Sequence, residues 1–84
     1  MLDKTRRIEI DEIEDALMAR TLDEVCEALE EKGYNPLHQI VGYLISGDPG
    51  YISSYRDARA KITEYDRTKL LITVLRGYLD KWNT

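Results

Sequence analysis

The sequence predicts an all-α fold, a compact bundle of four to five short helices preceded by a flexible N-terminal tail. Apolar residues recur at helical spacing in four separate stretches that follow residue 20. Glycine, proline and capping residues lie between these stretches, where helices stop and start. The 84 residues suffice for one domain with a modest core, and 43% of them are hydrophobic, which is typical of a globular chain.

Residues 1–20 differ from the rest of the chain. Charged residues occur at almost every step, and the apolar residues between them follow neither the helical nor the strand period for long. We therefore expect a flexible or partly ordered N-terminal tail over residues 1–20 and a helical domain over residues 21–84.

The first firm helix is expected to begin at Thr21 and to end at Gly33. Thr21 and Glu24 have the spacing of a capping box, and Gly33 can adopt the left-handed conformation that ends a helix. Asn35 can cap the next helix, and Pro36 suits its first turn because a missing N–H costs nothing there. The apolar stripe of the first helix consists of Leu22, Val25, Cys26 and Leu29.

A second helix is expected over residues 36–46, because Gly47 and the aspartate and proline that follow it would end it. Its apolar residues are Leu37, Ile40, Val41, Leu44 and Ile45. Gly42 is unexpected, since a glycine inside a helix costs about 1 kcal/mol relative to alanine. Gly77 also falls inside an expected helix, so we interpret the two glycines as one close backbone crossing, within a protomer or between two.

A third helix is expected over residues 54–65. Its buried side would be formed by Tyr55, Ala58, Ile62 and Tyr65. The opposite side would carry a partly cationic row, provided that the helix does not break first, and this row consists of Arg56, Arg59, Thr63 and Arg67. Asp57 and Glu64 could neutralise this row, so ordinary solvated charge is an equally good interpretation of it.

Asp66 can cap a fourth helix, which has the longest regular apolar stripe in the chain. This stripe consists of Leu70, Leu71, Val74, Leu75, Tyr78, Leu79 and Trp82. It is wide enough to face two neighbours. The small size of the chain, the two glycines and this stripe together predict a homodimer, which by the usual symmetry preference would be two-fold.

Neither catalysis nor a bound cofactor or metal is expected. Cys26 lies on an apolar stripe, with no cation or second thiol positioned to lower its pKa, and is interpreted as a core thiol. His38 has no serine, cysteine or metal-ligand pattern beside it and is interpreted as a polar residue of a first helical turn. The carboxylates are scattered or lie at capping and surface positions, whereas an active site needs polar groups that converge.

The distribution of charge argues against a general nucleic-acid binder. The net charge is −4, and the 11 acidic residues of positions 1–33 far outnumber the five basic ones. A helix-turn-helix spanning Gly33 to Ser46 is an alternative, although only His38 and Gln39 could contact a groove. A general protein-interaction module is the other alternative.

The sequence also predicts a cytoplasmic protein with no membrane partner. No apolar run approaches the roughly 20 residues of a membrane span. The basic residues near the start are not followed by the apolar segment of a secretory signal. A single cysteine cannot form an internal disulfide, which fits a reducing compartment.

One stretch of the chain resembles a known family. Residues 30–52 read EEKGYNPLHQIVGYLISGDPGYI, and DAR follows at residues 57–59. This pattern resembles the IreB/ReoM family of small bacterial regulatory phosphoproteins, and the resemblance is close from Ala28 to Arg59. Near the start of the chain, Asp3-Lys4-Thr5 resembles the phospho-acceptor site of the family.

The resemblance implies particular roles for a few residues. Thr5 would be the phosphorylated residue. Arg56, Arg59 and Arg67 would form a partner-binding patch, and Arg59 and Arg67 match basic positions of the family. The chain departs from that pattern at two positions where arginines would be expected, Ser54 and Thr63.

The resemblance also implies a function. By this resemblance, the chain would be a substrate of a membrane-bound, eukaryotic-type Ser/Thr kinase. A phosphatase would remove the phosphate. The resemblance implies that this chain would regulate peptidoglycan precursor synthesis and antibiotic tolerance. The unphosphorylated form would promote turnover of the first committed enzyme of that pathway by Clp-type protease machinery.

Overall fold

The computed structural model describes residues 4–82, with side chains described from Glu12 onward. This range contains four α-helices, α1 (Lys4–Glu31), α2 (Pro36–Ser46), α3 (Ala58–Ile62) and α4 (Arg67–Leu79). Three short 3₁₀ turns complete it, η1 (Pro49–Tyr51), η2 (Tyr55–Asp57) and η3 (Asp80–Trp82). The predicted all-α class is confirmed, since residues 4–82 contain no strand.

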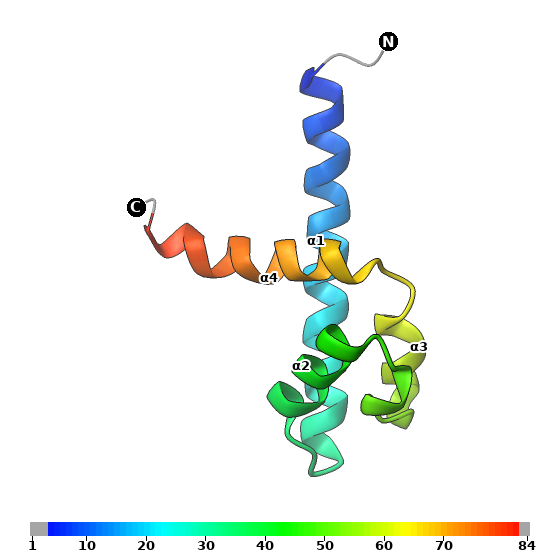
Figure 1. The fold of residues 1–84 in the computed structure, drawn as a ribbon. Helices are drawn as coiled ribbons and strands as arrows, with labels where there is room; N and C mark the ends of the chain where they lie inside the picture. The colour runs from blue at the N-terminus through cyan, green and yellow to red at the C-terminus, as the bar shows by residue number, and fades with distance from the viewer. Residues whose placement is uncertain (1–3, 83–84) are drawn as a thin grey trace.

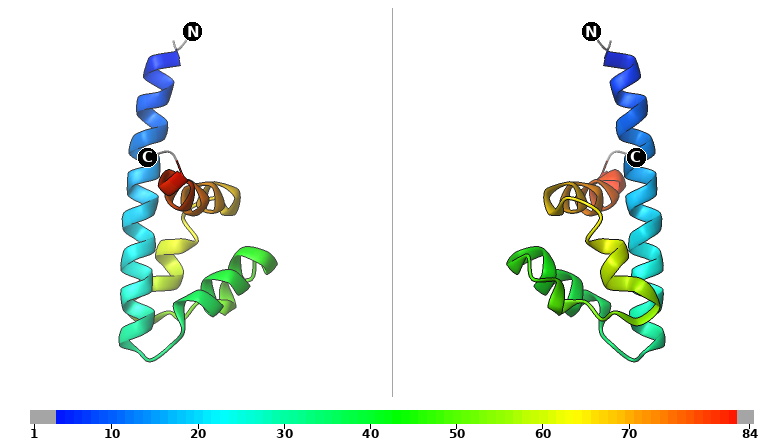
Figure 2. Two further views of the ribbon diagram at one scale, coloured as in Figure 1. Left: turned by 90° about the vertical axis from the view of Figure 1, so that its left-hand side faces the viewer. Right: turned by 90° about the vertical axis from the view of Figure 1, so that its right-hand side faces the viewer.

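The long helix α1 organises the other three. Figures 1 and 2 show α2, α3 and α4 on the same side of α1, with α2 and α3 beside its C-terminal half. Helix α4 crosses α1 near its middle and then extends past it to one side (Figure 1). None of the helices in the described residues combines the length and the apolar character needed to cross a membrane.

The core forms where the apolar stripe of α1 meets the later elements. This stripe contributes Met18, Val25, Ala28 and Leu29, each at most 3% exposed. The residues that complete the core are Tyr43, Ile52, Ala58, Ile62 and Leu70. Burying one large aliphatic side chain stabilises the fold by about 1.5–3 kcal/mol, so most of the stability of this small chain comes from this single cluster.

Helix α1 passes through Thr21 without interruption, so the predicted helix start at this residue is wrong. The Thr21 hydroxyl bonds to the Tyr65 hydroxyl at 3.4 Å instead of capping a helix. Upstream of Met18 the buried side of α1 continues with polar residues, Glu14 and Asp15, which bond to α4. Apolar periodicity therefore does not reveal the part of α1 that precedes Met18. Whether residues 1–20 move independently of residues 21–84 stays a prediction.

The signals between α1 and α2 act as predicted. Gly33 adopts φ +87°, and the Tyr34 N–H donates to the Leu29 carbonyl at 2.9 Å, which closes the end of α1. The Asn35 side chain accepts the His38 N–H at 3.3 Å and caps α2. At the other end of α2, Gly47 takes φ +75°.

The predicted third helix is shorter than expected. Residues 54–65 contain the turn η2 followed by α3, because Arg56 and Asp57 have φ values of +50° and +61° that interrupt an α-helix. The predicted buried side is nevertheless confirmed. Ala58 and Ile62 are fully buried, and Tyr55 and Tyr65 pack against the core.

Helix α4 begins as predicted, since the Asp66 carboxylate accepts the Lys69 N–H at 3.2 Å. The buried side of α4 contains far fewer residues than its apolar stripe. Only Leu70 and Thr73 of this helix are buried. Seven large apolar residues of α4 and η3 remain at least 43% exposed, and these are Leu71, Ile72, Val74, Leu75, Tyr78, Leu79 and Trp82.

The two glycines inside helices do not share one crossing within the protomer. A Cβ atom on Gly42 would lie 2.4 Å from Cδ1 of Tyr51, so this glycine makes room for an aromatic ring that follows α2 in the chain. A Cβ atom on Gly77 would meet no heavy atom of the chain within 4 Å. Gly42 is thus explained by local packing, and Gly77 has no such explanation in the protomer.

These glycines should respond oppositely to substitution. Gly42→Ala should lower the free energy of unfolding by about 1–3 kcal/mol, because the Tyr51 ring must move away from its place beside α2. Gly77→Ala should raise it by up to about 1 kcal/mol, because alanine favours the helix and meets no clash. Urea unfolding at one protein concentration measures both. A stabilised Gly42→Ala variant would contradict the packing described here.

Candidate functional site

The expected phospho-acceptor lies at the far end of the longest helix. Thr5 falls in the first turn of the backbone of α1, and its side chain lies outside the described part of the chain, as does Asp3. The first N–H groups of a helix have no intrahelical partners, so a terminal turn loses fewer hydrogen bonds on opening than a turn in the middle of a helix. The position is compatible with entry into a kinase cleft.

Arg56 is held against the end of α1. Its Nη1 donates to Glu31 Oε2 at 2.6 Å, and the Tyr55 hydroxyl donates to Glu31 Oε1 at 2.8 Å. Lys32 lies over the Tyr55 ring, 5.3 Å from its centroid. One carboxylate therefore holds the turn in which Arg56 adopts a left-handed conformation, which costs a non-glycine residue about 1–2 kcal/mol.

Arg59 and Arg67 are held by backbone carbonyl groups instead of carboxylates. The Arg59 Nε donates to the Ile52 carbonyl at 2.8 Å, and the Arg67 Nη1 donates to the Leu44 carbonyl at 3.1 Å. Among the described residues, neither guanidinium takes part in an ion pair. Both side chains are exposed. Each thus presents a positive charge that is oriented by a backbone carbonyl and forms no ion pair with the carboxylates of residues 12–82.

The three arginines do not form a row on one helix. Arg56 belongs to η2, Arg59 to α3 and Arg67 to the start of α4. The predicted spacing on a single helix is wrong, because the left-handed pair at residues 56–57 separates the first of them from α3. Their role in partner binding stays a prediction, and their environments now distinguish them: one is paired with a carboxylate and two are not.

The two positions that depart from the family pattern add no positive charge. Ser54 is exposed, and its side chain does not cap η2. Thr63 follows the last residue of α3, and its hydroxyl donates to the Arg59 carbonyl of that helix at 2.8 Å. Neither position therefore contributes a cation to an anion-binding surface in this region.

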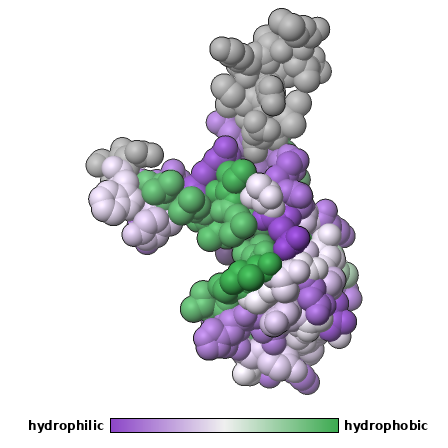
Figure 3. Space-filling view, in the orientation of Figure 1, coloured by the Kyte–Doolittle hydropathy of each residue, from purple (hydrophilic) through white to green (hydrophobic). Residues whose placement is uncertain are grey.

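A second candidate surface is apolar. Figure 3 shows a continuous hydrophobic face that runs along α4 and down to α2. Beside it lies a groove of about 510 Å³, whose lining includes Leu22, Cys26, Leu37, Val41 and Val74 from α1, α2 and α4. Leu37 and Ile45 of α2 are 66% and 80% exposed. An apolar face of this extent is typical of an interface.

The single cysteine and the single histidine lie on different helices, α1 and α2. Burial raises the pKa of the Cys26 thiol, and the nearby Asp23 and Glu30 carboxylates raise it further, so the thiol is held in its protonated form. His38 is exposed, and its backbone N–H serves the cap of α2. No cluster of three or more metal-ligating side chains occurs within the described residues.

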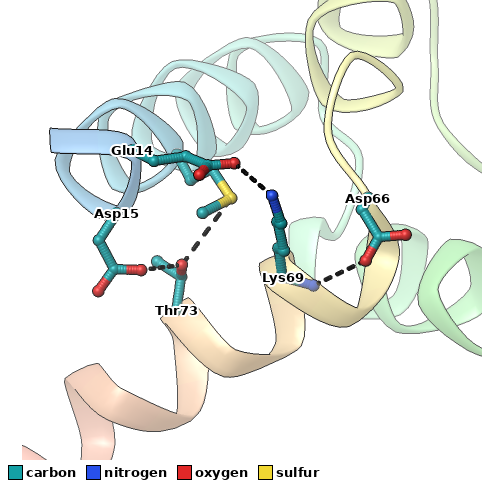
Figure 4. A network of polar contacts seen from close by, with 6 residues as sticks. Glu14, Asp15, Asp66, Lys69 and Thr73 are labelled. Carbon is teal, nitrogen blue, oxygen red and sulfur yellow. Dashed lines mark hydrogen bonds and ion pairs between the residues drawn. The ribbon is translucent and has the colours of Figure 1, made fainter. Parts of the chain in front are cut away.

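A polar junction between α1 and α4 was not found by sequence reasoning. Lys69 donates to Glu14 at 2.9 Å, and Thr73 donates to Asp15 at 2.5 Å. Figure 4 shows how these side chains of α1 and α4 face one another. Arg76 donates to the other Asp15 oxygen at 3.2 Å. The hydrogen bond from Thr73, assisted by Arg76, lowers the pKa of Asp15. No sequence signal pairs residues so far apart. The only indication was that Glu14 and Asp15 continue the apolar stripe of α1 toward the N-terminus.

The Glu31 contacts predict a specific dependence of stability on pH. Hydrogen bonds from Tyr55 and then Arg56 lower the pKa of Glu31. Because the folded pKa is the lower one, the stabilisation is complete above the unfolded value of about 4.3 and is lost as pH falls through the folded value. Glu31→Gln should therefore be less stable than the unchanged chain at neutral pH, and the difference should shrink in acid.

Urea unfolding across this pH range measures the difference. Glu64→Gln serves as the control, because Glu64 is exposed and its carboxylate forms no ion pair with the described residues. It should match the unchanged chain at every pH. A constant gap between Glu31→Gln and the unchanged chain from neutral to strongly acidic pH would contradict the assigned role of this carboxylate.

The comparison with known families agrees with the resemblance seen in the motif. A model of the family described as IreB regulatory phosphoprotein matches residues 3–80, which is nearly the whole chain. The match includes the position of Thr5, the segment that contains all three arginines, and the whole of α4. The chain belongs to the IreB family of regulatory phosphoproteins.

Proposed function

We propose that this protein is a non-enzymatic regulator whose activity is switched by phosphorylation of Thr5. The family match over residues 3–80 is the observation that carries this proposal. A eukaryotic-type Ser/Thr kinase would add the phosphate and a phosphatase would remove it. The location of Thr5 at the end of α1, distant from the buried cluster, supports a modification that leaves the fold intact.

The geometry of α1 bears on how the phosphate acts. A phosphate adds about −1.5 to −2 charges, which the positive N-terminal end of a helix dipole favours. At 1.5 Å per residue, Thr5 lies about 39 Å along α1 from Glu31, the residue that holds Arg56. While α1 is helical, phosphothreonine therefore does not compete for Arg56 in its own protomer. We propose that it changes binding to a partner.

The wider role follows the family resemblance. We propose a cytoplasmic regulator of peptidoglycan precursor synthesis and antibiotic tolerance, acting through turnover of a pathway enzyme by Clp-type protease machinery. The exposed, carbonyl-anchored guanidinium groups of Arg59 and Arg67 support docking of an acidic partner surface, because they are oriented before binding. Arg56 would contribute less, since Glu31 already neutralises it.

A nucleic-acid-binding role has less support. The exposed side of α2 carries Leu37, Val41 and Ile45, which do not bind phosphates or read base edges. The same residues suit contact with another protein.

The assignment of Thr5 can be tested in cells and with purified kinase. Mass spectrometry should find the phosphate on Thr5 when the kinase is active and not when it is inactivated. Thr5→Ala should lose labelling, and Thr63→Ala should keep it, because the Thr63 hydroxyl is bonded to the Arg59 carbonyl of α3. Thr5→Ala and Thr5→Glu should melt within about 2 °C of the unchanged chain, since substitutions away from packed structure have small effects. Full labelling of Thr5→Ala would show that another residue is modified.

We further propose that the protein acts as a homodimer. Seven large apolar residues of α4 and η3 are at least 43% exposed, and Leu37 and Ile45 of α2 are 66% and 80% exposed. A standard interface buries about 800 Å² from each partner and has an apolar centre. The hydrophobic face over α4 and α2 places apolar surface where a second copy would cover it (Figure 3).

Light scattering after size exclusion should give twice the chain mass at micromolar concentrations. Leu75→Glu should give a monomer, because Leu75 is 55% exposed on α4 and a carboxylate there would be buried in the interface. Ser54→Glu adds the same charge at an exposed position outside this face and should remain dimeric. A monomer mass for the unchanged chain at all concentrations would refute the homodimer.

A further inference from the structure

Helix α4 has little apolar attachment to its own protomer. Its buried residues are Leu70 and Thr73, while the rest of its large apolar residues remain exposed. One buried leucine can hold a helix against a neighbour, but hydrophobic contact is not directional. Leu70 alone does not determine how α4 is rotated about its axis.

The polar contacts between α4 and α1, here called the polar junction, determine how α4 is rotated about its axis. Its three donors, Lys69, Thr73 and Arg76, occupy successive turns on one side of α4. Their acceptors are adjacent residues of α1, Glu14 and Asp15 (Figure 4). Hydrogen bonds weaken steeply as their angle changes, so this set fixes both the rotation and the crossing of α4.

Asp15 is the centre of the junction. Its two oxygens accept from two residues of α4, with Thr73 on Oδ1 and Arg76 on Oδ2. The Thr73 hydroxyl lies 3.9 Å from the Met18 sulfur, so the same side chain contacts the edge of the core. The Lys69–Glu14 ion pair is more exposed and holds the neighbouring turn.

We propose that Asp15 and Thr73 are positioning residues for self-association, because they fix the rotation of α4 that presents its apolar face to a second copy. This inference rests on the proposed homodimer and adds the device that orients its surface. The side of α4 opposite to the junction is the one that continues into the exposed side of α2 (Figure 3). If α4 rotates, these two surfaces no longer form one face, and the second copy loses a continuous partner.

The test compares dimer dissociation constants from sedimentation equilibrium over a dilution series of the full chain. Asp15→Asn and Thr73→Val should each weaken association at least about tenfold, since bonds to charged groups are among the stronger ones. Thr73→Val is the informative change, because valine keeps the shape and adds apolar character. If α4 were held only by apolar packing, valine would associate as well as threonine.

Two controls accompany these variants. Thr73→Ser retains the hydroxyl and should associate within about twofold to threefold of the unchanged chain. Glu24→Gln removes a carboxylate of α1 that pairs with Arg20 and Lys61, and not with α4, so it should also leave association unchanged. Hydrogen exchange gives a second readout, in which the α4 amides should exchange faster in Thr73→Val while the amides of α1 near Val25 do not.

The outcomes separate this inference from the homodimer itself. If the unchanged chain is monomeric, the homodimer proposal fails and this inference fails with it. If the unchanged chain dimerises and both Asp15→Asn and Thr73→Val dimerise equally well, only the positioning role is refuted. A variant that unfolds, detected by circular dichroism, is replaced by the other one, because Thr73→Val removes the donor hydroxyl and Asp15→Asn removes the charge of the acceptor and one of its two acceptor oxygens.

Discussion

Burial of the apolar stripe of α1 is the interaction on which the rest of the structure depends. Val25 and Leu29 are fully buried by elements that follow much later in the chain, above all Ile52 and Ile62. Helices α2 and α3 are too short to be stable alone, so they depend on packing against this surface. The single long helix therefore acts as the support against which each short element folds.

The second constraint is the left-handed turn at Arg56 and Asp57. Two successive non-glycine residues in this conformation are unfavourable, and Glu31 offsets part of that cost through bonds to Tyr55 and Arg56. The turn redirects the chain so that Ala58 and Ile62 reach the core. It also places Arg59 where its Nε meets the Ile52 carbonyl, so the orientation of a proposed docking residue follows from packing at the other side of α3.

Helix α4 combines a narrow attachment with a wide exposed face. The position of α4 relies on hydrogen bonds to carboxylates of α1, and hydrogen bonds are directional. Most of its large apolar residues stay exposed, where a partner could cover them. This division explains why one helix can be both well placed and largely unburied. It also connects the proposed functions, because the helix that begins with the Thr5 segment is the one that holds α4. The proposed arginine docking surface lies elsewhere, on η2, α3 and the start of α4.

The sequence by itself determined the end of α1, both ends of α2, the start of α4, the apolar positions and the family. Gly33, Asn35, Gly47 and Asp66 specify their conformations or caps through their own backbone and side chains, so each is readable without knowledge of the fold. The motif from Ala28 to Arg59 indicated the family that the match over residues 3–80 confirms. These signals are local, which is why they could be recognised.

Only the tertiary structure decided the length of α1, the break before α3 and the positions of the arginines. Each depends on a partner distant in sequence: Asp15 on Thr73 and Arg76, and Arg56 on Glu31. In isolation, Glu14 and Asp15 are ordinary charged residues, and Arg56 fits a regular helix. Their native roles arise because folding brings a complementary group within hydrogen-bonding distance, and that proximity is a property of the packed chain and not of any local pattern.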